Sequence, residues 1–331
     1  AAGVAVDSFP RRIYIHAFTS ACGVGGSGSS GGNPSDATLN GTISLSTLVH
    51  ELGHNLTLGH ANSLDCKPNV IGAYQNCLKI SYGDPFTPMG HSANGVFHHN
   101  SFQKSQIGWL SGQVREVTQD GTYTINPLAA STQGTKALKI RKNDTNEYYF
   151  LEYRQPVAGT FDALLPPDAV NGSLIRVAYY LPISGDNPFD SPETLLLDTH
   201  PDTPDAPYGF FDAALRDGET FFDSSNQISV TQISHNTDGV TLSIDLPDII
   251  PTRVIVLPAE IRTYTDSRST GLSALLYDQN DQPIWSAVSY DWGISSTNSI
   301  GTLTQINGNI ATFVPQNKGR GQVWVTARYN D

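Results

Sequence analysis

The chain contains 331 residues, which is enough for two or three domains with at least one full hydrophobic core and excludes a single small module. Its formal net charge of −12 argues against duplex nucleic acid or an anionic membrane surface as a partner, because both require basic patches. Only 15% of the residues are charged, and the 30 Gly and 20 Pro favour turns and strands over helix. No apolar run reaches the roughly 18 to 20 residues of a spanning helix, so we expect no membrane span.

The first elements expected along the chain are a strand, a glycine-rich loop and a helix. Residues 12–19 are rich in β-branched and aromatic side chains and predict a strand. Residues 23–36 are rich in Gly and Ser and indicate a flexible turn or the rim of a cleft, since the lysine of a phosphate-binding loop is absent. Over residues 45–56 the apolar side chains recur every three or four positions, which predicts a helix with Ser44 or Ser46 as its N-cap.

A second, shorter helix is expected over residues 100–107, and strands are expected after it. The later segments alternate or run apolar over five to eight residues between turn signals, as in sandwiches and barrels. We therefore expect a β-rich sandwich domain over residues 113–248. Beyond a linker near residues 248–252, the strand spacing is typical of a small immunoglobulin-like sandwich over residues 249–331, which ends short of its last strand.

The segment from residue 50 to residue 60 reads HELGHNLTLGH and carries the clearest chemical signal. His50 and His54 are four residues apart on the predicted helix, so their imidazoles project from one face and can hold one metal ion. His60 can supply a third nitrogen if the chain turns sharply after the helix. Three neutral imidazoles and a water form the open tetrahedral site of a catalytic zinc, and Glu51 is placed to deprotonate that water as general base.

The three cysteines and one acidic stretch allow two further predictions. No two cysteines have the spacing of a zinc motif, but Cys66 and Cys77 could close a short loop as a disulfide in an oxidising compartment. Cys22 would then be free or pair outside this chain. Residues 186–205 contain five aspartates among Pro and Gly and could ligate calcium through oxygen, although they lack the pattern of a calcium-binding loop. A solvated acidic loop is therefore the preferred interpretation.

The histidine motif, together with the downstream segment YGDPFTPMGH, resembles the metzincin clan of zinc metallopeptidases. The signature of that clan is HExxHxxGxxH followed by a methionine turn. The text HELGHNLxLGHA with YGDxxxxMG, then a lysine-containing helix and GWL, is most similar to the gametolysin family, over about residues 12–112. The resemblance implies one catalytic zinc, with Glu51 as general base and Met89 in an apolar floor beneath the metal ligands His50, His54 and His60.

The same resemblance assigns substrate-binding residues. It implies an exposed edge strand on which an extended peptide pairs, formed by Ala21, Cys22, Gly23, Val24 and Gly25. His91 stands two residues after Met89, where some relatives carry a ligand tyrosine. It either approaches the metal or the oxyanion, or is an ordinary loop residue.

Two departures from the clan pattern bear on activity. Thr57 replaces the signature glycine, so the turn that delivers His60 must be made by a β-branched residue, which is strained at positive φ. Only 49 residues precede His50, so we expect a catalytic domain that is incomplete at its N-terminus.

The sequence as a whole predicts a secreted or cell-surface zinc metalloendopeptidase of the α+β class. Its domains are a metzincin-like catalytic domain over residues 1–112, a β-sandwich over 113–248 and an immunoglobulin-like sandwich over 249–331. The expected partner is a peptide or protein, such as a matrix or cell-wall glycoprotein. The alternatives are a zinc-binding pseudoenzyme or adhesin whose β modules carry the function, and a metal-dependent hydrolase of a substrate other than peptide.

Overall fold

The computed structural model describes most of the chain, namely residues 5–41, 43–91, 95–143, 145, 147–179, 192–203, 210–262, 269–279, 281–285, 287–296 and 300–329. The chain divides into two compact units, Ala1–Pro247 and Asp248–Asp331. Of the two boundaries predicted from the sequence, the one after residue 248 lies next to this division and the one after residue 112 lies inside the first unit.

The predicted α+β class is wrong, because the protein is mostly β-sheet. Strands make up 43% of the structure and helices 12%, and the described residues contain only two α-helices. Part of the error concerns residues 61–80, which were assigned to a separate catalytic domain ending at residue 112. Those residues instead form two strands that join the same large sheet as strands from residues 114–197.

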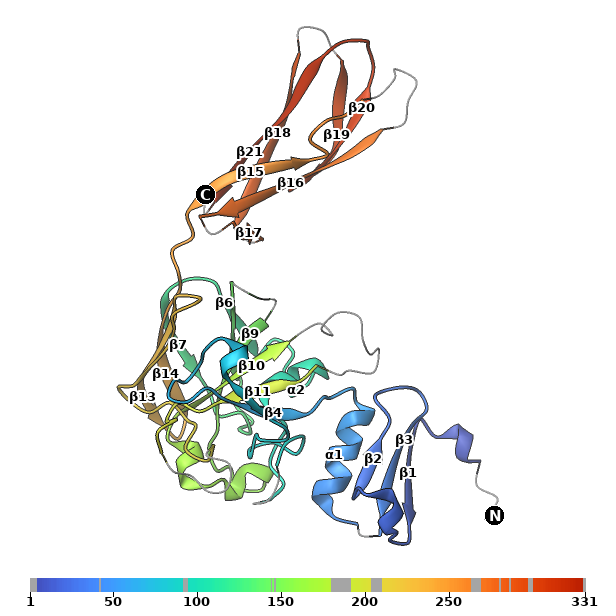
Figure 1. Cartoon of the computed structure of the whole chain (residues 1–331), viewed down its shortest axis with the longest axis vertical. Helices are drawn as coiled ribbons and strands as arrows, with labels where there is room; N and C mark the ends of the chain where they lie inside the picture. Colours follow the sequence, from blue (N-terminus) through green and yellow to red (C-terminus); the bar gives the residue numbers. More distant parts are fainter. Residues whose placement is uncertain are drawn as a thin grey trace. The chain divides into compact units, whose positions relative to one another are not determined.

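A small sheet and the first helix form the N-terminal part of the first unit (Figure 1). The strand order is β1-β3-β2, with β1 and β3 parallel and β2 antiparallel to β3. Helix α1 packs against β2 and β3. The bounds are β1 Arg11–His16, β2 Gly26–Gly28, β3 Ser35–Asn40 and α1 Leu45–Asn55.

Helix α1 begins and ends as its sequence predicts. Of the two candidate N-caps, Ser44 is the one used: its hydroxyl accepts the backbone N–H of Thr47 at 3.0 Å and so pairs one free donor of the first turn. Leu56 is the C-cap, and Thr57 follows with φ 71° in the left-handed region. The second predicted helix is also present as α2, Ser101–Gln106.

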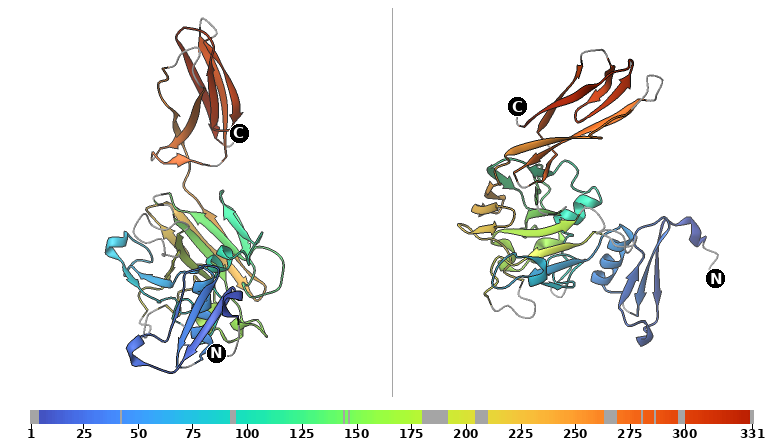
Figure 2. Two further views of the ribbon diagram at one scale, coloured as in Figure 1. Left: turned by 90° about the vertical axis from the view of Figure 1, so that its right-hand side faces the viewer. Right: turned by 45° about the horizontal axis from the view of Figure 1, so that its top comes forward.

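Two larger sheets pack face to face in the same unit and enclose its main core (Figure 2). The core is lined by Tyr149 and Ile175 from one sheet and by Val230 and Leu242 from the other. The seven-stranded sheet has the order β5-β4-β11-β10-β9-β8-β6, and the four-stranded sheet has the order β12-β13-β14-β7. The bounds are β4 Ala61–Asp65, β5 Leu78–Ile80, β6 Val114–Val117, β7 Gly121–Ile125, β8 Ala137–Arg141, β9 Glu147–Tyr153, β10 Ser173–Tyr179, β11 Thr194–Leu197, β12 Thr220–Asp223, β13 Ile228–Asn236 and β14 Gly239–Asp245.

The predicted disulfide joins Cys66 to Cys77 and closes the hairpin between β4 and β5. Cys22 is exposed and free. Short 3₁₀ helices complete the unit: η1 Val6–Ser8, η2 Ser20–Cys22, η3 Tyr74–Asn76, η4 Phe161–Leu164 and η5 Pro167–Val170.

The second unit consists of antiparallel strands, including those predicted from its alternating pattern. One sheet has the order β15-β16-β20-β19 with β17 beside β16, and a second sheet pairs β18 with β21. The bounds are β15 Pro251–Leu257, β16 Thr270–Asp278, β17 Pro283–Ile284, β18 Val288–Ser296, β19 Gly301–Asn307, β20 Ile310–Pro315 and β21 Gly321–Tyr329. Among the described residues of both units, no helix is long and apolar enough to cross a membrane.

Candidate metal centre

Three histidines converge at the C-terminal half of α1. His50 and His54 lie one turn apart on the helix, and His60 directly precedes β4. The Nε2 atom of His54 lies 3.2 Å from that of His50 and 3.1 Å from that of His60. Within the described part of the chain, this is the only group of three or more His, Cys, Asp or Glu side chains that could hold a metal ion.

Backbone carbonyls orient two of these imidazoles. The Nδ1 of His50 lies 2.8 Å from the carbonyl oxygen of Pro88, and the Nδ1 of His54 lies 2.9 Å from that of Leu58. A carbonyl only accepts, so each Nδ1 carries the proton and donates it. Both Nε2 atoms are therefore left with lone pairs that face the centre, and hydrogen bonds of this kind orient imidazoles that ligate a metal.

The geometry fits a small divalent ion. Nitrogen ligands about 2.0–2.1 Å from a tetrahedral zinc stand about 3.3 Å apart. The two Nε2 separations that involve His54, 3.2 and 3.1 Å, are close to this value, and the ligand atoms of all three histidines lie within 4.8 Å of one another. Lone pairs that face one another at such distances repel unless a cation or proton lies between them, so the donor set fits a metal ion.

Burial keeps the three imidazoles neutral at ordinary pH. It lowers the pKa of His50 and of His54, and it lowers that of His60 to about 4 with the added effect of the other two rings and of Lys79. A neutral imidazole is the form that ligates metal.

A left-handed turn at Thr57 delivers His60 to the other two histidines. The N–H of Leu58 bonds the carbonyl of Gly53, and the N–H of Thr57 bonds that of His54, which reverses the chain after the helix. The β-branched residue therefore makes the turn with φ 71°, as the sequence predicted. The strain does not prevent the third imidazole from reaching the cluster.

Met89 is fully buried and packs beneath the helix turn between the two histidines. A Cβ on Gly53 would lie 2.3 Å from the Sδ of Met89, so only glycine permits this close approach. Leu58 and Ala61 join Met89 in one apolar cluster. This arrangement matches the predicted floor beneath the ligands.

Glu51 lies on the opposite side of the histidines, against the glycine-rich strand β2. Glu51 is 6% exposed, and burial raises the pKa of its carboxyl group to about 7. A Cβ on Gly26 would lie 2.7 Å from the Oε1 of Glu51, and one on Gly28 would lie 2.5 Å from its carbonyl oxygen. The segment predicted as a flexible turn or cleft rim therefore contains a strand whose glycines allow it to lie directly on the helix.

A pocket opens between β2, α1 and the loop around Met89. It is lined by Val24, Gly25, Gly26, Ser46, Thr47, His50, Glu51, Tyr82 and Gly90. The pocket brings the candidate metal ligand His50 and the predicted base Glu51 to one surface that is open to solvent.

The predicted substrate strand is only partly where the sequence placed it. Ala21 and Cys22 form the 3₁₀ helix η2 and Gly23 is left-handed, so these three residues are not in a strand. Val24 and Gly25 line the pocket, and the strand itself begins at Gly26. The error has a local cause, because consecutive glycines carry no side-chain pattern that marks where a strand starts.

His91 is not among the pocket-lining residues of the described structure. Its N–H donates to the carbonyl of Asp84 at 3.0 Å. Tyr82, which was not singled out from the sequence, does line the pocket, and its ring lies against that of His60 with centroids 4.2 Å apart and an interplanar angle of 44°. Burial raises the pKa of Tyr82, and the charges of Glu51 and Glu193 add to this. In the sequence, the only feature that pointed to Tyr82 was its position as the first residue of the YGD segment.

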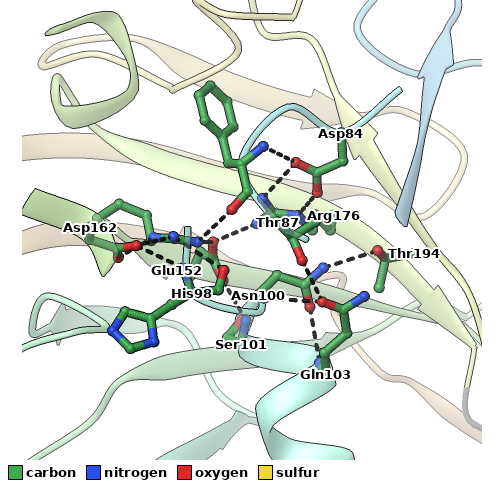
Figure 3. A network of polar contacts seen from close by, with 12 residues as sticks. Asp84, Thr87, His98, Asn100, Ser101, Gln103, Glu152, Asp162, Arg176 and Thr194 are labelled. Atoms are coloured by element: carbon green, nitrogen blue, oxygen red, sulfur yellow. Dashed lines mark hydrogen bonds and ion pairs between the residues drawn. The ribbon is translucent and has the colours of Figure 1, made fainter. Parts of the chain in front are cut away.

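A buried network of charges holds the loop that carries Met89 (Figure 3). Arg176 of β10 binds Asp84 through two nitrogens, at 2.6 and 3.3 Å, and lies 2.8 Å from Glu152. Arg154 donates to the carbonyl of Phe86 at 3.1 Å and binds Asp162. The two arginines and their partners thereby fix the segment that presents the carbonyl of Pro88 to His50.

Helix α2 holds the same loop from another side. The hydroxyl of Thr87 donates to Gln103 at 2.7 Å, and Gln103 in turn donates to the carbonyl of Gly59, next to His60, at 3.3 Å. Asn100 and Gln103 form a capping box that fixes the start of the helix.

A calcium site, the less favoured interpretation of residues 186–205, is not assembled from the described aspartates. Asp198 accepts the N–H of His200 at 2.8 Å, and burial raises its pKa to about 6. Asp202 joins no metal-holding group in the described part of the chain. Asp186, Asp190 and Asp205 lie outside the described residues.

Comparison with protein-family models finds no match, and comparisons with curated proteins and with solved structures find none either. The resemblance to the metzincin clan therefore rests on the motif residues alone and stays a prediction.

Proposed function

We propose that this chain is a zinc-dependent endopeptidase in which His50, His54 and His60 hold the ion and Glu51 transfers protons. The observation that carries the proposal is the convergence of the three imidazoles, one of which, His50, lines an open pocket together with Glu51. Zinc suits this donor set, because imidazole is a common zinc ligand whereas calcium and magnesium prefer oxygen.

The chemistry divides between the ion and the side chains around it. When bound, zinc polarises a carbonyl group and makes a water molecule acidic enough to attack near neutral pH. Among the described residues that line the pocket, Glu51 is the only carboxylate, so it takes the proton from that water and returns it to the leaving amine. The carbonyls of Pro88 and Leu58 keep the ligand imidazoles in the tautomer that the site requires.

An extended peptide is the substrate that the pocket suits best. Among the described strands, β2 pairs with β3 alone and ends its sheet, so its other edge offers backbone groups to an added strand. Gly26 and Gly28 carry no side chains, and a peptide strand added to this edge would lie beside Glu51. The Cys66–Cys77 disulfide supports a secreted or cell-surface location, where matrix or cell-wall glycoproteins are candidate substrates.

The test compares the wild-type protein with Glu51→Gln. We expect the wild type, loaded with one zinc, to cleave an unfolded protein such as casein and to lose this activity with a chelator. Glu51→Gln should bind zinc normally and cleave at least about 100-fold more slowly, because only the proton transfer is removed.

Two results would contradict the proposal in different ways. Zinc bound without cleavage of any protein would support a pseudoenzyme or adhesin. Cleavage of small esters or amidated sugars, with protein untouched, would support a hydrolase of another substrate class.

A further inference from the structure

The ring of Tyr82 lies against that of His60, the third proposed metal ligand. Its ring centroid lies 4.2 Å from that of His60, at an interplanar angle of 44°, and 5.8 Å from that of His50. Tyr82 also lines the candidate substrate pocket together with Glu51. The residue is 41% exposed, so its ring contributes to this site more than to the core of the protein.

The disulfide-closed hairpin explains how Tyr82 returns to His60. His60 precedes β4 and Tyr82 follows β5, and these strands pair antiparallel with Ser63 opposite Ile80. The Cys66–Cys77 bridge closes the far end of the hairpin. Two residues that are distant in sequence are thereby fixed at the same end of one small element.

The backbone of Tyr82 is strained and is held in place by a buried side chain. Its φ is 57°, in the left-handed region that disfavours an aromatic residue. The buried side chain of Asn62 accepts the N–H of Tyr82 at 2.9 Å, and the N–H of Gly83 bonds the carbonyl of Ile80 to close the turn. Glycine or asparagine would suit this turn better, so stability alone does not explain a tyrosine here.

His60 is held differently from the other two ligands. A backbone carbonyl accepts from the Nδ1 of His50 and of His54, whereas none of the hydrogen bonds among the described residues involves the Nδ1 of His60. The ring of His60 lies against those of His50, His54 and Tyr82, and of these three only Tyr82 is outside the histidine cluster. We propose that Tyr82 is a positioning residue, whose ring fixes the orientation in which His60 ligates the metal. This inference rests on the proposed metal site and adds an outer-shell residue to it.

The test measures metal binding directly, with zinc affinity and the visible spectrum of the cobalt-loaded protein as readouts. Tyr82→Gly removes the ring and relieves the positive φ, so the protein should fold at least as stably without metal. We expect its zinc Kd to rise about 10- to 100-fold, as for other outer-shell partners, and its cobalt spectrum to change. Tyr82→Phe keeps the ring and should bind zinc within about twofold of the wild type.

Gln227→Gly is the matched control. Gln227 is an exposed residue with φ 54° in the turn before β13, so this variant relieves the same strain away from the site. Its zinc affinity should equal that of the wild type. Wild-type affinity in Tyr82→Gly, or an equal loss in Tyr82→Phe, would overturn the inference. If the wild type itself binds no zinc, the proposed function fails instead.

Discussion

The three-histidine site and the buried charge network both contact the loop that carries Met89, but their ionisable groups are arranged differently. In the network, Asp84, Glu152 and Asp162 are fully buried, and each is paired with Arg154 or Arg176. In the site, three imidazoles are pointed at one another, and the carboxylate beside them faces a pocket. Opposite charges that pair with one another stabilise a fold, whereas nitrogen lone pairs that converge on one point suit an added ion.

The largest effect expected from this contrast is on stability. Arg176→Met leaves Asp84 buried without its partner, which should lower the free energy of unfolding by about 3–5 kcal/mol. Lys139→Met, at the partly exposed pair with Glu116, should cost no more than about 1 kcal/mol. Denaturant unfolding measures both. Loss of zinc binding in Arg176→Met with unchanged stability would contradict the structural role of the network.

The second largest effect expected is a loss of stability at low pH, through Glu152 of the network. Burial raises the pKa of Glu152, but the charges of Arg176 and Arg154 outweigh this and lower it to about 2. Since the folded pKa lies below the ordinary value, the unfolded chain binds the proton more readily, and stability is lost as pH falls from about 5 towards 2.

The size of this acid effect is on the order of 3 kcal/mol. Unfolding measured across that pH range should show the slope in the wild type, and Glu152→Gln should flatten it. An identical slope in both proteins would show that other carboxylates cause the acid sensitivity.

The smallest expected effect concerns the turn that delivers His60. Thr57→Gly relieves a β-branched residue at φ 71° and should stabilise the metal-free protein by about 1 kcal/mol without weakening zinc binding. Thermal unfolding and zinc titration measure the two quantities. A lower melting temperature would indicate that the contact between Thr57 and Gly31 contributes more than the strain costs.

Local features of the fold could be predicted from the sequence. Helix α1, its cap at Ser44 and the positive φ at Thr57 depend on nearby residues, and their patterns are short. Strand β4, with the polar sequence ANSLD, could not be predicted because its burial comes from pairing with β11, more than a hundred residues away.

The same division holds for the candidate site: residues close in sequence could be predicted, and residues brought in by tertiary contacts could not. The spacing of His50, Glu51 and His54 follows from one helix, so the motif alone identifies them. Tyr82 and the arginines of the network reach the site through tertiary contacts, and no spacing in the sequence connects them to it.

The central claim is that three imidazoles, His50, His54 and His60, bind one and the same ion. X-ray absorption at the zinc edge of the loaded protein, compared with His60→Ala, tests it most directly. We expect one zinc per chain with three nitrogen ligands at about 2.0–2.1 Å, and one fewer in the variant. An unchanged ligand count after removal of His60 would show that this residue does not bind the metal and would contradict the account.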